Sequence, residues 1–508
     1  MNEKASTYLK LRLVLFASLL VLSERPLLSN DNINRSLSRE QATEDLSIYF
    51  ELIDKQHGNP YQFISRSAFL DALNTTIDNL PEQIEFKAFE VTLSKLNNLI
   101  RCGHTIINLD ANLIKSASEA NHFFPLPIAL IKEQVYVDFE DSTIPHGAQL
   151  MAINGQEIGE VINELLLLTV TDGFSQAKPL RELETKFGYY FFLKYGAYNS
   201  FEVTYLTPKG IQTKTTISGV AGNQMLANNY YRPVYKTNER YYHFTHLDAI
   251  DSLQTLVLTL NTFQANPDWF AERLSALYDQ ESKKFEFDNL VIDLRNNEGG
   301  DRRLLTLLYQ FVAGEHLVDP SNTSIRSNQI QFEDYLLGIN GAVGSKEAIE
   351  KAETYLNQHF TYANEEGFES AEQNWYDTFD AGINWQGQTF NGQVYVLTSG
   401  KTFSAAADLA RILAELDHVI LVGEETGGAH IGRTANMLLN YDLPNTHTMV
   451  QIPVIYEEFV NANKQNEGRG TFPDFHITQT YPDLLAKKDS AFEFTLDLIQ
   501  QKQLQGAN

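Results

Sequence analysis

Ser404 stands where a serine can act as a nucleophile. It follows a strand-like run, residues 393–398 (QVYVLT), and a short turn, and it precedes the alanine-rich start of a helix at residues 405–410. A serine at such a junction has an exposed hydroxyl, and the N–H of the next residue can help to bind an oxyanion. A serine that only caps the helix N-terminus would occupy the same position. The local pattern leaves both interpretations open.

A second motif could supply a further backbone donor. The apolar run at residues 290–294 (LVIDL) reads as a buried strand, and it leads into residues 295–300 (RNNEGG). Paired glycines let the backbone turn tightly and point an N–H into a cleft. An ordinary turn is the commoner use of such a pair, so this motif alone is weak.

The remaining chemistry-bearing side chains do not indicate a metal or a cofactor. Cys102 is the single cysteine, so it can form neither an intrachain disulfide nor a thiolate zinc site by itself, and we give it no catalytic role. The motif His-Glu-x-x-His does not occur, and His243 and His246 lie in an aromatic, strand-like run where packing is the simpler account. We therefore expect no cofactor and no metal.

Charge excludes one large class of partner. Asp and Glu number 65 against 39 Lys and Arg, which gives a formal net charge of -26. Such a surface repels phosphate backbones, so we expect no nucleic-acid partner. Hydrophobic residues make up 43% of the chain, which is ordinary for a globular protein with a sizeable core.

The N-terminus predicts export. Lys4, Lys10 and Arg12 precede an apolar run at residues 13–22 that is too short to span a bilayer but suits a signal peptide. Val21 and Ser23 are small enough to precede a cleavage site, so we expect a signal peptide over residues 1–23. An uncleaved anchor is the alternative. No later segment is apolar enough to cross a membrane, and we expect a periplasmic or extracellular protein.

The elements that must position these motifs form three parts. Apolar residues recur at helical spacing three times within residues 40–102, which predicts a helical segment over residues 24–123. Residues 124–220 read as a small, mostly β module. Within it, residues 147–155 (GAQLMAING) resemble a PDZ domain, a fold that binds peptide C-termini by adding a strand to a sheet edge. The stretch at residues 172–193 departs from that fold.

From residue 221 to about 500, strands and helices alternate as in an α/β core. Runs at residues 255–260, 289–294, 393–398 and 419–422 read as its strands. Residues 319–387 are polar and irregular, and we expect there an insertion of short helices that covers the site.

Four motifs in order resemble the tail-specific (C-terminal processing) serine peptidases and their tricorn-like branch. They are residues 293–300 (DLRNNEGG), 402–405 (TFSA), 423–428 (GEETGG) and 470–474 (GTFPD). The resemblance implies a crotonase-like core of stacked βα units over residues 221–500 and acyl transfer to Ser404. It also implies that Gly300 and Ala405 supply the N–H groups of the oxyanion hole.

The general base departs from the commonest pattern of that family. The tail-specific branch has a lysine where this chain has Ala429, and no lysine occurs at residues 403–463. The tricorn-like branch uses an early histidine, which maps to His104 in the run at residues 101–105 (RCGHT), where the serine before the histidine is replaced by Gly103. A neutral imidazole can take the serine proton near pH 7.

A late glutamate of the tricorn-like branch maps to Glu467, which would orient His104. His430 and Glu425 are rivals for these two roles. The resulting prediction is an exported serine-type endopeptidase that cleaves polypeptides, with Ser404 as nucleophile, His104 as base and Glu467 as orienter. The alternatives are a binding protein for lipophilic ligands on the same fold and a hydrolase of small molecules.

Overall fold

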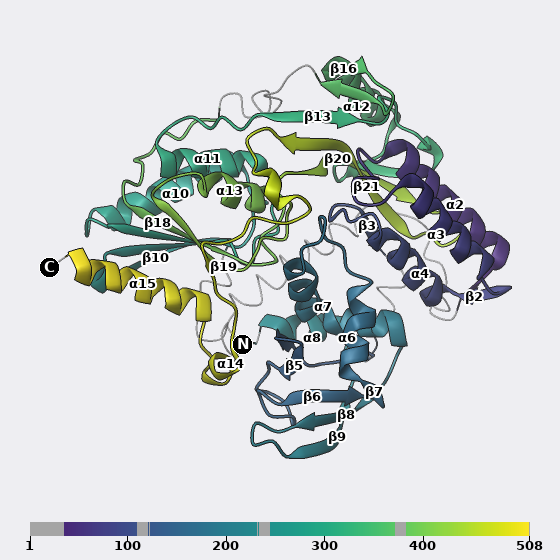
Figure 1. Ribbon diagram of the computed structural model, residues 1–508, viewed down its shortest axis with the longest axis horizontal. Helices are drawn as coiled ribbons and strands as arrows, with labels where there is room; N and C mark the ends of the chain where they lie inside the picture. The colour runs from purple at the N-terminus through teal and green to yellow at the C-terminus, as the bar shows by residue number, and fades with distance from the viewer. Residues whose placement is uncertain are drawn as a thin grey trace.

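The computed structural model describes residues 35–108, 120, 122–230, 232, 244–370 and 383–506. Three large sheets organise it, and a small two-stranded sheet pairs β1 (Ser36–Ser38) with β2 (Gln83–Glu85) (Figure 1). The predicted export segment lies outside the described residues. Among the helices of the described residues, none is long and apolar enough to cross a membrane.

The first sheet carries the predicted nucleophile. Its strands, in spatial order, are β10 (Thr245–Ile250), β11 (Thr255–Leu260), β12 (Asn289–Asp293), β18 (Gln393–Thr398), β19 (Val419–Gly423) and β22 (Phe475–His476). All pairs are parallel except β10 with β11. The central strands are buried on both faces, as their continuous apolar runs predict.

Helices cover both faces of this sheet (Figure 1). On one face, α10 (Pro267–Ser282), α11 (Arg302–Ala313) and α13 (Ala405–Leu413) pack against alternate strand residues such as Leu256 and Leu258. On the other face lies α15 (Ser490–Gly506). Its Ile499 shares an apolar cluster with the strand residues that point to that face, such as Val257. Sequence analysis placed four of these strands correctly to within about one residue.

A second sheet has eight strands and lies over the N-terminal helices. Its centre is the long hairpin of β20 (Gly432–Asp442) and β21 (Met449–Phe459). The other strands are β3 (Ile106–Asn108), β13 (Ser321–Ile325), β14 (Leu336–Ile339), β15 (Ala342–Val343), β16 (Phe360–Ala363) and β17 (Phe368–Ser370). The three predicted helical stripes form α2 (Arg39–Gln56), α3 (Arg66–Asp78) and α4 (Phe86–Asn98), which share one apolar core with this sheet.

The expectation of short helices over residues 319–387 is wrong for the part that the structure describes. Strands β13 to β17 lie there, with one turn of 3₁₀ helix and the 14-residue helix α12 (Lys346–His359). The strands complete the second sheet, and α12 packs its Leu356 into the core of that sheet. Burial alternates along β13, where Ser321, Thr323 and Ile325 are buried and Asn322 is exposed, because one side of the strand faces the core.

The third sheet forms the module, which we define as residues 122–230. Its antiparallel strands are β4 (Ile128–Ile131), β5 (Gln134–Val137), β6 (Gln149–Ile153), β7 (Gln156–Glu157), β8 (Ser200–Leu206) and β9 (Gln212–Ser218). Its helices are α6 (Ile158–Leu166), α7 (Ala177–Tyr195) and α8 (Gly222–Tyr230). Helix α7 begins within the stretch at residues 172–193 and ends two residues beyond it, and its Leu183 and Phe187 belong to the core of the module.

Helix α7 also closes one edge of the module sheet. The edge strand is β4, and the N–H of Leu130 donates to Glu184 Oε1 at 2.5 Å. The carbonyl of Leu130 accepts from Arg181 Nη2 at 3.3 Å. Arg181 also pairs with Glu424 Oε2 of the α/β core at 3.1 Å. The module edge and the core are therefore joined through one helix.

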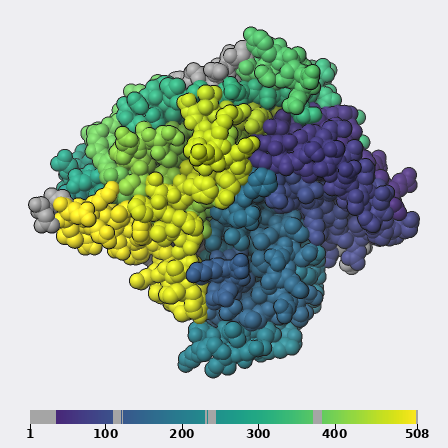
Figure 2. Space-filling view, viewed as in Figure 1, coloured from purple at the N-terminus to yellow at the C-terminus, as the bar shows by residue number. Residues whose placement is uncertain are grey.

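The last part of the chain ties the three parts together. In the space-filling view it lies against both the module and the N-terminal helices (Figure 2). The carbonyl of Gly468 accepts from the N–H of Phe174 at 2.6 Å, and Tyr481 donates to the carbonyl of Gly147 at 3.1 Å. Segments that are distant in sequence thus meet around the turn that carries Ser404.

Candidate active site

Ser404 occupies the N-cap position of α13, but it does not cap the helix. Its backbone has φ 51° and ψ -132°, and its side chain makes no capping hydrogen bond. A capping serine has extended backbone angles and accepts from the second or third N–H of the helix. Positive φ is uncommon outside glycine and clusters at functional sites. The geometry therefore favours the nucleophile over the capping interpretation.

Hydrogen bonds hold the nucleophile turn to the segment after β12. Thr402 Oγ1 donates to the carbonyl of Leu294 at 3.0 Å, and Ser399 Oγ donates to the carbonyl of Arg295 at 2.6 Å. The N–H of Phe403 donates to the carbonyl of Asn297 at 3.1 Å. Because the strands β12 and β18 are adjacent and parallel, their C-terminal ends bring the two motifs side by side.

The glycine pair lies directly against Ser404. A Cβ atom placed on Gly299 would lie 2.7 Å from the Cβ of Ser404 and 3.0 Å from the nitrogen of Ala405, and Gly299 has φ 93°. Any larger residue would collide with the nucleophile. Position 299 thus requires a glycine for two reasons: its φ is positive, and a side chain there would have no space beside Ser404.

The two predicted oxyanion donors have free N–H groups. Gly300 pairs with Phe263 as a parallel bridge. In this bridge the N–H of Phe263 donates to the carbonyl of Gly299, and the N–H of Asp301 donates to the carbonyl of Phe263. In this pattern the N–H of Gly300 points away from Phe263. Ala405 is the first residue of α13, so its N–H has no acceptor within the helix. Neither N–H has a hydrogen-bond partner among the described residues.

His104 lies in the loop between α4 and β3, with its ring stacked on Phe403. The ring centroids are 4.6 Å apart, and His104 is only 7% exposed. Burial, and then the charges of Arg433 and Lys178, hold its pKa well below the ordinary value. Within the described residues neither ring nitrogen has a hydrogen-bond partner, so the imidazole and the Ser404 hydroxyl are not joined in this structure. The ring is neutral and is free to accept a proton.

The other sequence candidates are engaged elsewhere or exposed. Glu425 binds Arg469 at 2.6 Å and the N–H of Gly470 at 2.8 Å. His430 shares a hydrogen bond of 3.0 Å with the hydroxyl of Thr471, and burial lowers its pKa to about 4. These contacts do not place either rival beside Ser404.

Glu467, by contrast, is exposed at the end of a 3₁₀ turn, whereas His104 is buried with both ring nitrogens unpaired. The structure therefore does not bring the carboxylate of Glu467 into contact with the imidazole. Its role as orienter stays a prediction.

Sequence reasoning missed two charged residues beside the site, Asp172 and Lys178. Lys178 Nζ lies 4.8 Å from the ring centroid of Phe403, so a lysine that is distant in sequence lies next to the residue before Ser404. Its ammonium donates to the carbonyl of Val170 and to Glu182, both at 3.1 Å. Despite the opposing effect of burial, Lys178 and a second lysine lower the pKa of Glu182. The amine of Lys178 is therefore engaged by Glu182 and Val170 and is not directed at Ser404.

One buried trio in the described residues has metal-ligand chemistry. Cys102, His104 and Asp172 each offer an atom, and these atoms lie within 4.8 Å of one another. Burial raises the pKa of the Cys102 thiol to about 12, whereas a metal ligand must be a thiolate. Two cations, Arg433 and Lys178, already act on His104 and Asp172. We assign no metal to this trio.

A serine with a free hydroxyl, a glycine pair and a buried neutral imidazole together define the class of serine hydrolases. Comparison with known proteins defines the class more narrowly. Residues 254–477 match the model of peptidase family S41. The chain carries a peptidase family S41 domain and is a serine-type peptidase.

Two solved structures of CPAF share the fold at low identity. Mature CPAF is 13% identical, with 90% of this chain and 96% of that chain covered and a TM-score of 0.59. CPAF in complex with lactacystin is 12% identical, with 92% of this chain and 98% of that chain covered and a TM-score of 0.57. The C-terminal processing protease of photosystem II D1 is 14% identical over 86% of this chain and 93% of that chain, with a TM-score of 0.39.

Proposed function

We propose that this peptidase cleaves polypeptides through an acyl-enzyme on Ser404, with His104 as general base. The observation that carries the proposal is the strained N-cap position of Ser404, whose side chain forms no cap and which adjoins the unpaired N–H of Ala405. A serine held at positive φ without capping its helix is a costly arrangement that structural needs alone do not account for. The neutral imidazole on the adjacent Phe403 supplies the base.

The chemistry proceeds in two halves. His104 takes the hydroxyl proton while Ser404 Oγ attacks the peptide carbonyl, and the N–H groups of Gly300 and Ala405 stabilise the oxyanion. The C–N bond then breaks, and the leaving amine receives the proton from His104. In the second half, His104 takes a proton from water, the hydroxide attacks the ester, and the carboxylic acid leaves as Ser404 regains its proton.

The sheet architecture supports a crotonase-like core and a PDZ-like module. The core has parallel strands with helices on both faces, and the module has antiparallel strands with a short helix after the Asn154-Gly155 turn. The sequence analysis assigned the orienting role to Glu467, whose exposed side chain does not contact His104 in this structure. For this role its exposed side chain would have to turn inward when substrate binds.

A fluorophosphonate probe tests the nucleophile directly. The probe should label Ser404 in the wild-type protein and should not label the Ser404→Ala variant. A cleavage profile of an unfolded proteome, wild type against variant, should show cuts in the wild-type sample only. Labelling that persists in the variant would point to another nucleophile.

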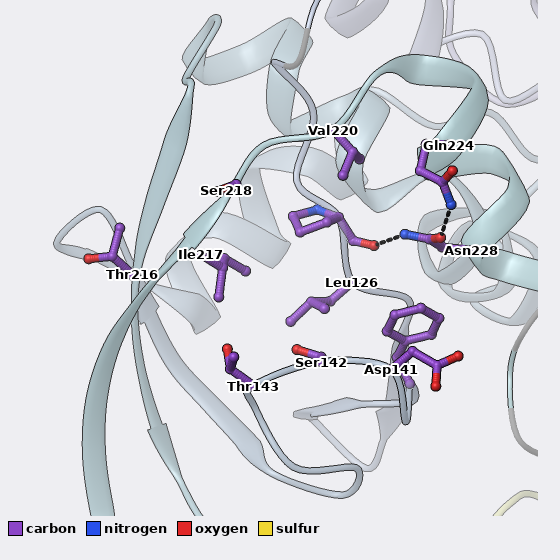
Figure 3. A pocket seen from close by; sticks show the side chains of 12 residues that line it. Leu126, Asp141, Ser142, Thr143, Thr216, Ile217, Ser218, Val220, Gln224 and Asn228 are labelled. Atoms are coloured by element: carbon purple, nitrogen blue, oxygen red, sulfur yellow. Dashed lines mark hydrogen bonds between the residues drawn. The ribbon is translucent and has the colours of Figure 1, made fainter.

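We further propose that cleavage does not depend on the C-terminal carboxylate of the substrate. Strand addition needs a free sheet edge, and α7 already occupies the backbone groups of Leu130 on the β4 edge. Beside the opposite edge strand, β9, lies a cavity of about 550 Å³ (Figure 3). Apolar side chains such as Leu126 and Ile217 line it, but its one charged lining residue is Asp141, which repels a carboxylate.

Amidation of a substrate peptide at its C-terminus should therefore change kcat/KM by less than about threefold. A site that reads the carboxylate would lose charge-assisted hydrogen bonds of about 1.5–3 kcal/mol, which corresponds to a factor of about ten or more. The measurement compares peptides of one sequence with free and amidated C-termini. A tenfold loss on amidation would contradict this proposal.

Export completes the proposed function. The basic start and the short apolar run of residues 1–23 support a signal peptide, so the mature N-terminus should lie near Glu24. The mature protein would then act outside the cytoplasm.

A further inference from the structure

Asp172 joins the segment that carries His104 to the turn after β19. Its Oδ1 accepts from the N–H of Gly103 at 2.6 Å, and its Oδ2 accepts from the N–H of Ala429 at 3.4 Å. Asp172 is only 3% exposed. A carboxylate is rarely buried this deeply without a partner of opposite charge, and here the closest partners are backbone N–H groups on either side of the active site.

The backbone that carries Asp172 is fixed on both sides. The N–H of Gly173 donates to the carbonyl of Arg101 at 2.8 Å, and the N–H of Phe174 donates to the carbonyl of Gly468 at 2.6 Å. Gly173 has φ 63°, and a Cβ there would lie 2.4 Å from the carbonyl oxygen of Gly468. The carboxylate therefore has little freedom to move away from the histidine segment.

The carboxylate is close to the imidazole as well as to the backbone. An oxygen of Asp172 and a ring nitrogen of His104 lie within 4.8 Å of each other. Neither ring nitrogen has a partner among the described residues, although both are buried. Gly103 makes this approach possible, since a Cβ there would lie 3.1 Å from Asp172 Oδ1 and 2.7 Å from the ring of Phe403.

We propose that Asp172 is the positioning residue of the catalytic histidine. It holds the loop of His104 through the N–H of Gly103, and it accepts an N–H from the imidazole once that ring has taken the proton of Ser404. Since the two groups lie within 4.8 Å of each other, a short movement of the ring is enough to form this hydrogen bond. This inference rests on the proposed function of Ser404 and His104, and it gives Asp172 the role that the sequence assigned to Glu467.

The charges around Asp172 fit a carboxylate that stabilises the imidazole of His104 once that ring is protonated. Burial raises the pKa of Asp172, while Arg433 on β20 and Lys178 on α7 oppose that rise. The same two cations, with His57 after α2, disfavour the imidazolium of His104. Cys102 faces the carboxylate as a protonated thiol. Asp172 is thus an acid that lies close enough to His104 to stabilise a positive charge on its imidazole.

Asp172→Asn tests the charge with little change in shape, and Glu467→Gln is the matched variant. The Asn side chain still offers an oxygen to the N–H of Gly103. We expect kcat to fall by about 10²- to 10⁴-fold in Asp172→Asn, as for the loss of a triad carboxylate, with KM changed less than about threefold. The acid limb of the pH profile should move to lower pH, because the imidazolium loses a stabilising negative charge. Glu467→Gln should change neither quantity.

A second measurement does not need activity. In the Ser404→Ala background, NMR titration should show the pKa of His104 lower in Asp172→Asn by about one unit or more, and unchanged in Glu467→Gln. An unchanged pKa in Asp172→Asn, or a larger shift in Glu467→Gln, would overturn the inference. If wild-type protein cleaves nothing, the proposed function fails, yet the titration still decides whether Asp172 acts on His104.

Discussion

Replacing Ser404 with alanine should lower kcat/KM for an unfolded polypeptide by about 10⁶-fold, the loss seen when a serine peptidase loses its nucleophile. The free energy of unfolding should change little, because the hydroxyl makes no capping hydrogen bond. Activity assays with a fluorogenic polypeptide and thermal unfolding of the same samples measure both effects.

Ser345 provides the matched control, since it also occupies an N-cap position. Its side chain accepts from the N–H of Ala348 at 3.1 Å at the start of α12. Ser345→Ala should destabilise the protein by about 1 kcal/mol and leave kcat unchanged. The two substitutions should therefore have opposite effects: Ser404→Ala removes activity and keeps stability, whereas Ser345→Ala lowers stability and keeps activity. If Ser404→Ala instead destabilised the protein and kept its activity, Ser404 would be a helix cap after all.

His104→Gln should lower kcat by about 10⁴-fold or more, because the serine cannot lose its proton unaided. Burial and nearby cations lower the pKa of His104, so the base stays neutral below pH 6.5. The acid limb of the rate profile should therefore lie below pH 6.5. A profile of kcat/KM from pH 4 to 8 measures it, and a limb above pH 7 would point to a different base.

Stability should fall in acid for the same reason. A histidine with a depressed pKa stays neutral in the folded protein but is protonated in the unfolded chain below about pH 6.5, so stability is lost as the pH drops. His57, with a pKa near 3, and His430, near 4, have the same sign. His430→Gln is the control for the base, since it should weaken this acid dependence while kcat remains within about tenfold of wild type.

The sequence was most informative where structure is local. The strands that flank Ser404 and Gly300 are continuous apolar runs, and buried parallel strands have that pattern whatever surrounds them. The resemblance to a peptidase family then drew attention to His104. The same local reasoning failed for residues 319–387, where strands of one sheet are separated by long stretches of chain.

The acid that faces His104 could not be predicted from sequence, because its position depends on tertiary contacts. Asp172 stands in a stretch with no motif, and contacts of the neighbouring backbone with Arg101 and Gly468 bring it to Gly103. Lys178 is similar, since α7 carries it to Phe403 from the module. The one available signal was negative: residues 172–193 did not fit the module that surrounds them.

Helix α7 has a consequence for how this protein can diversify. The helix seals the β4 edge through Arg181 and Glu184, and its first turn, with Ala177 and Lys178, packs on Gly400 and Gly427 beside Ser404. A recombination event that replaced the module with another domain would also remove Asp172 and Lys178 from the active site. Module and catalytic core must therefore be inherited together, and viable chimeras should have their crossover points outside residues 172–195.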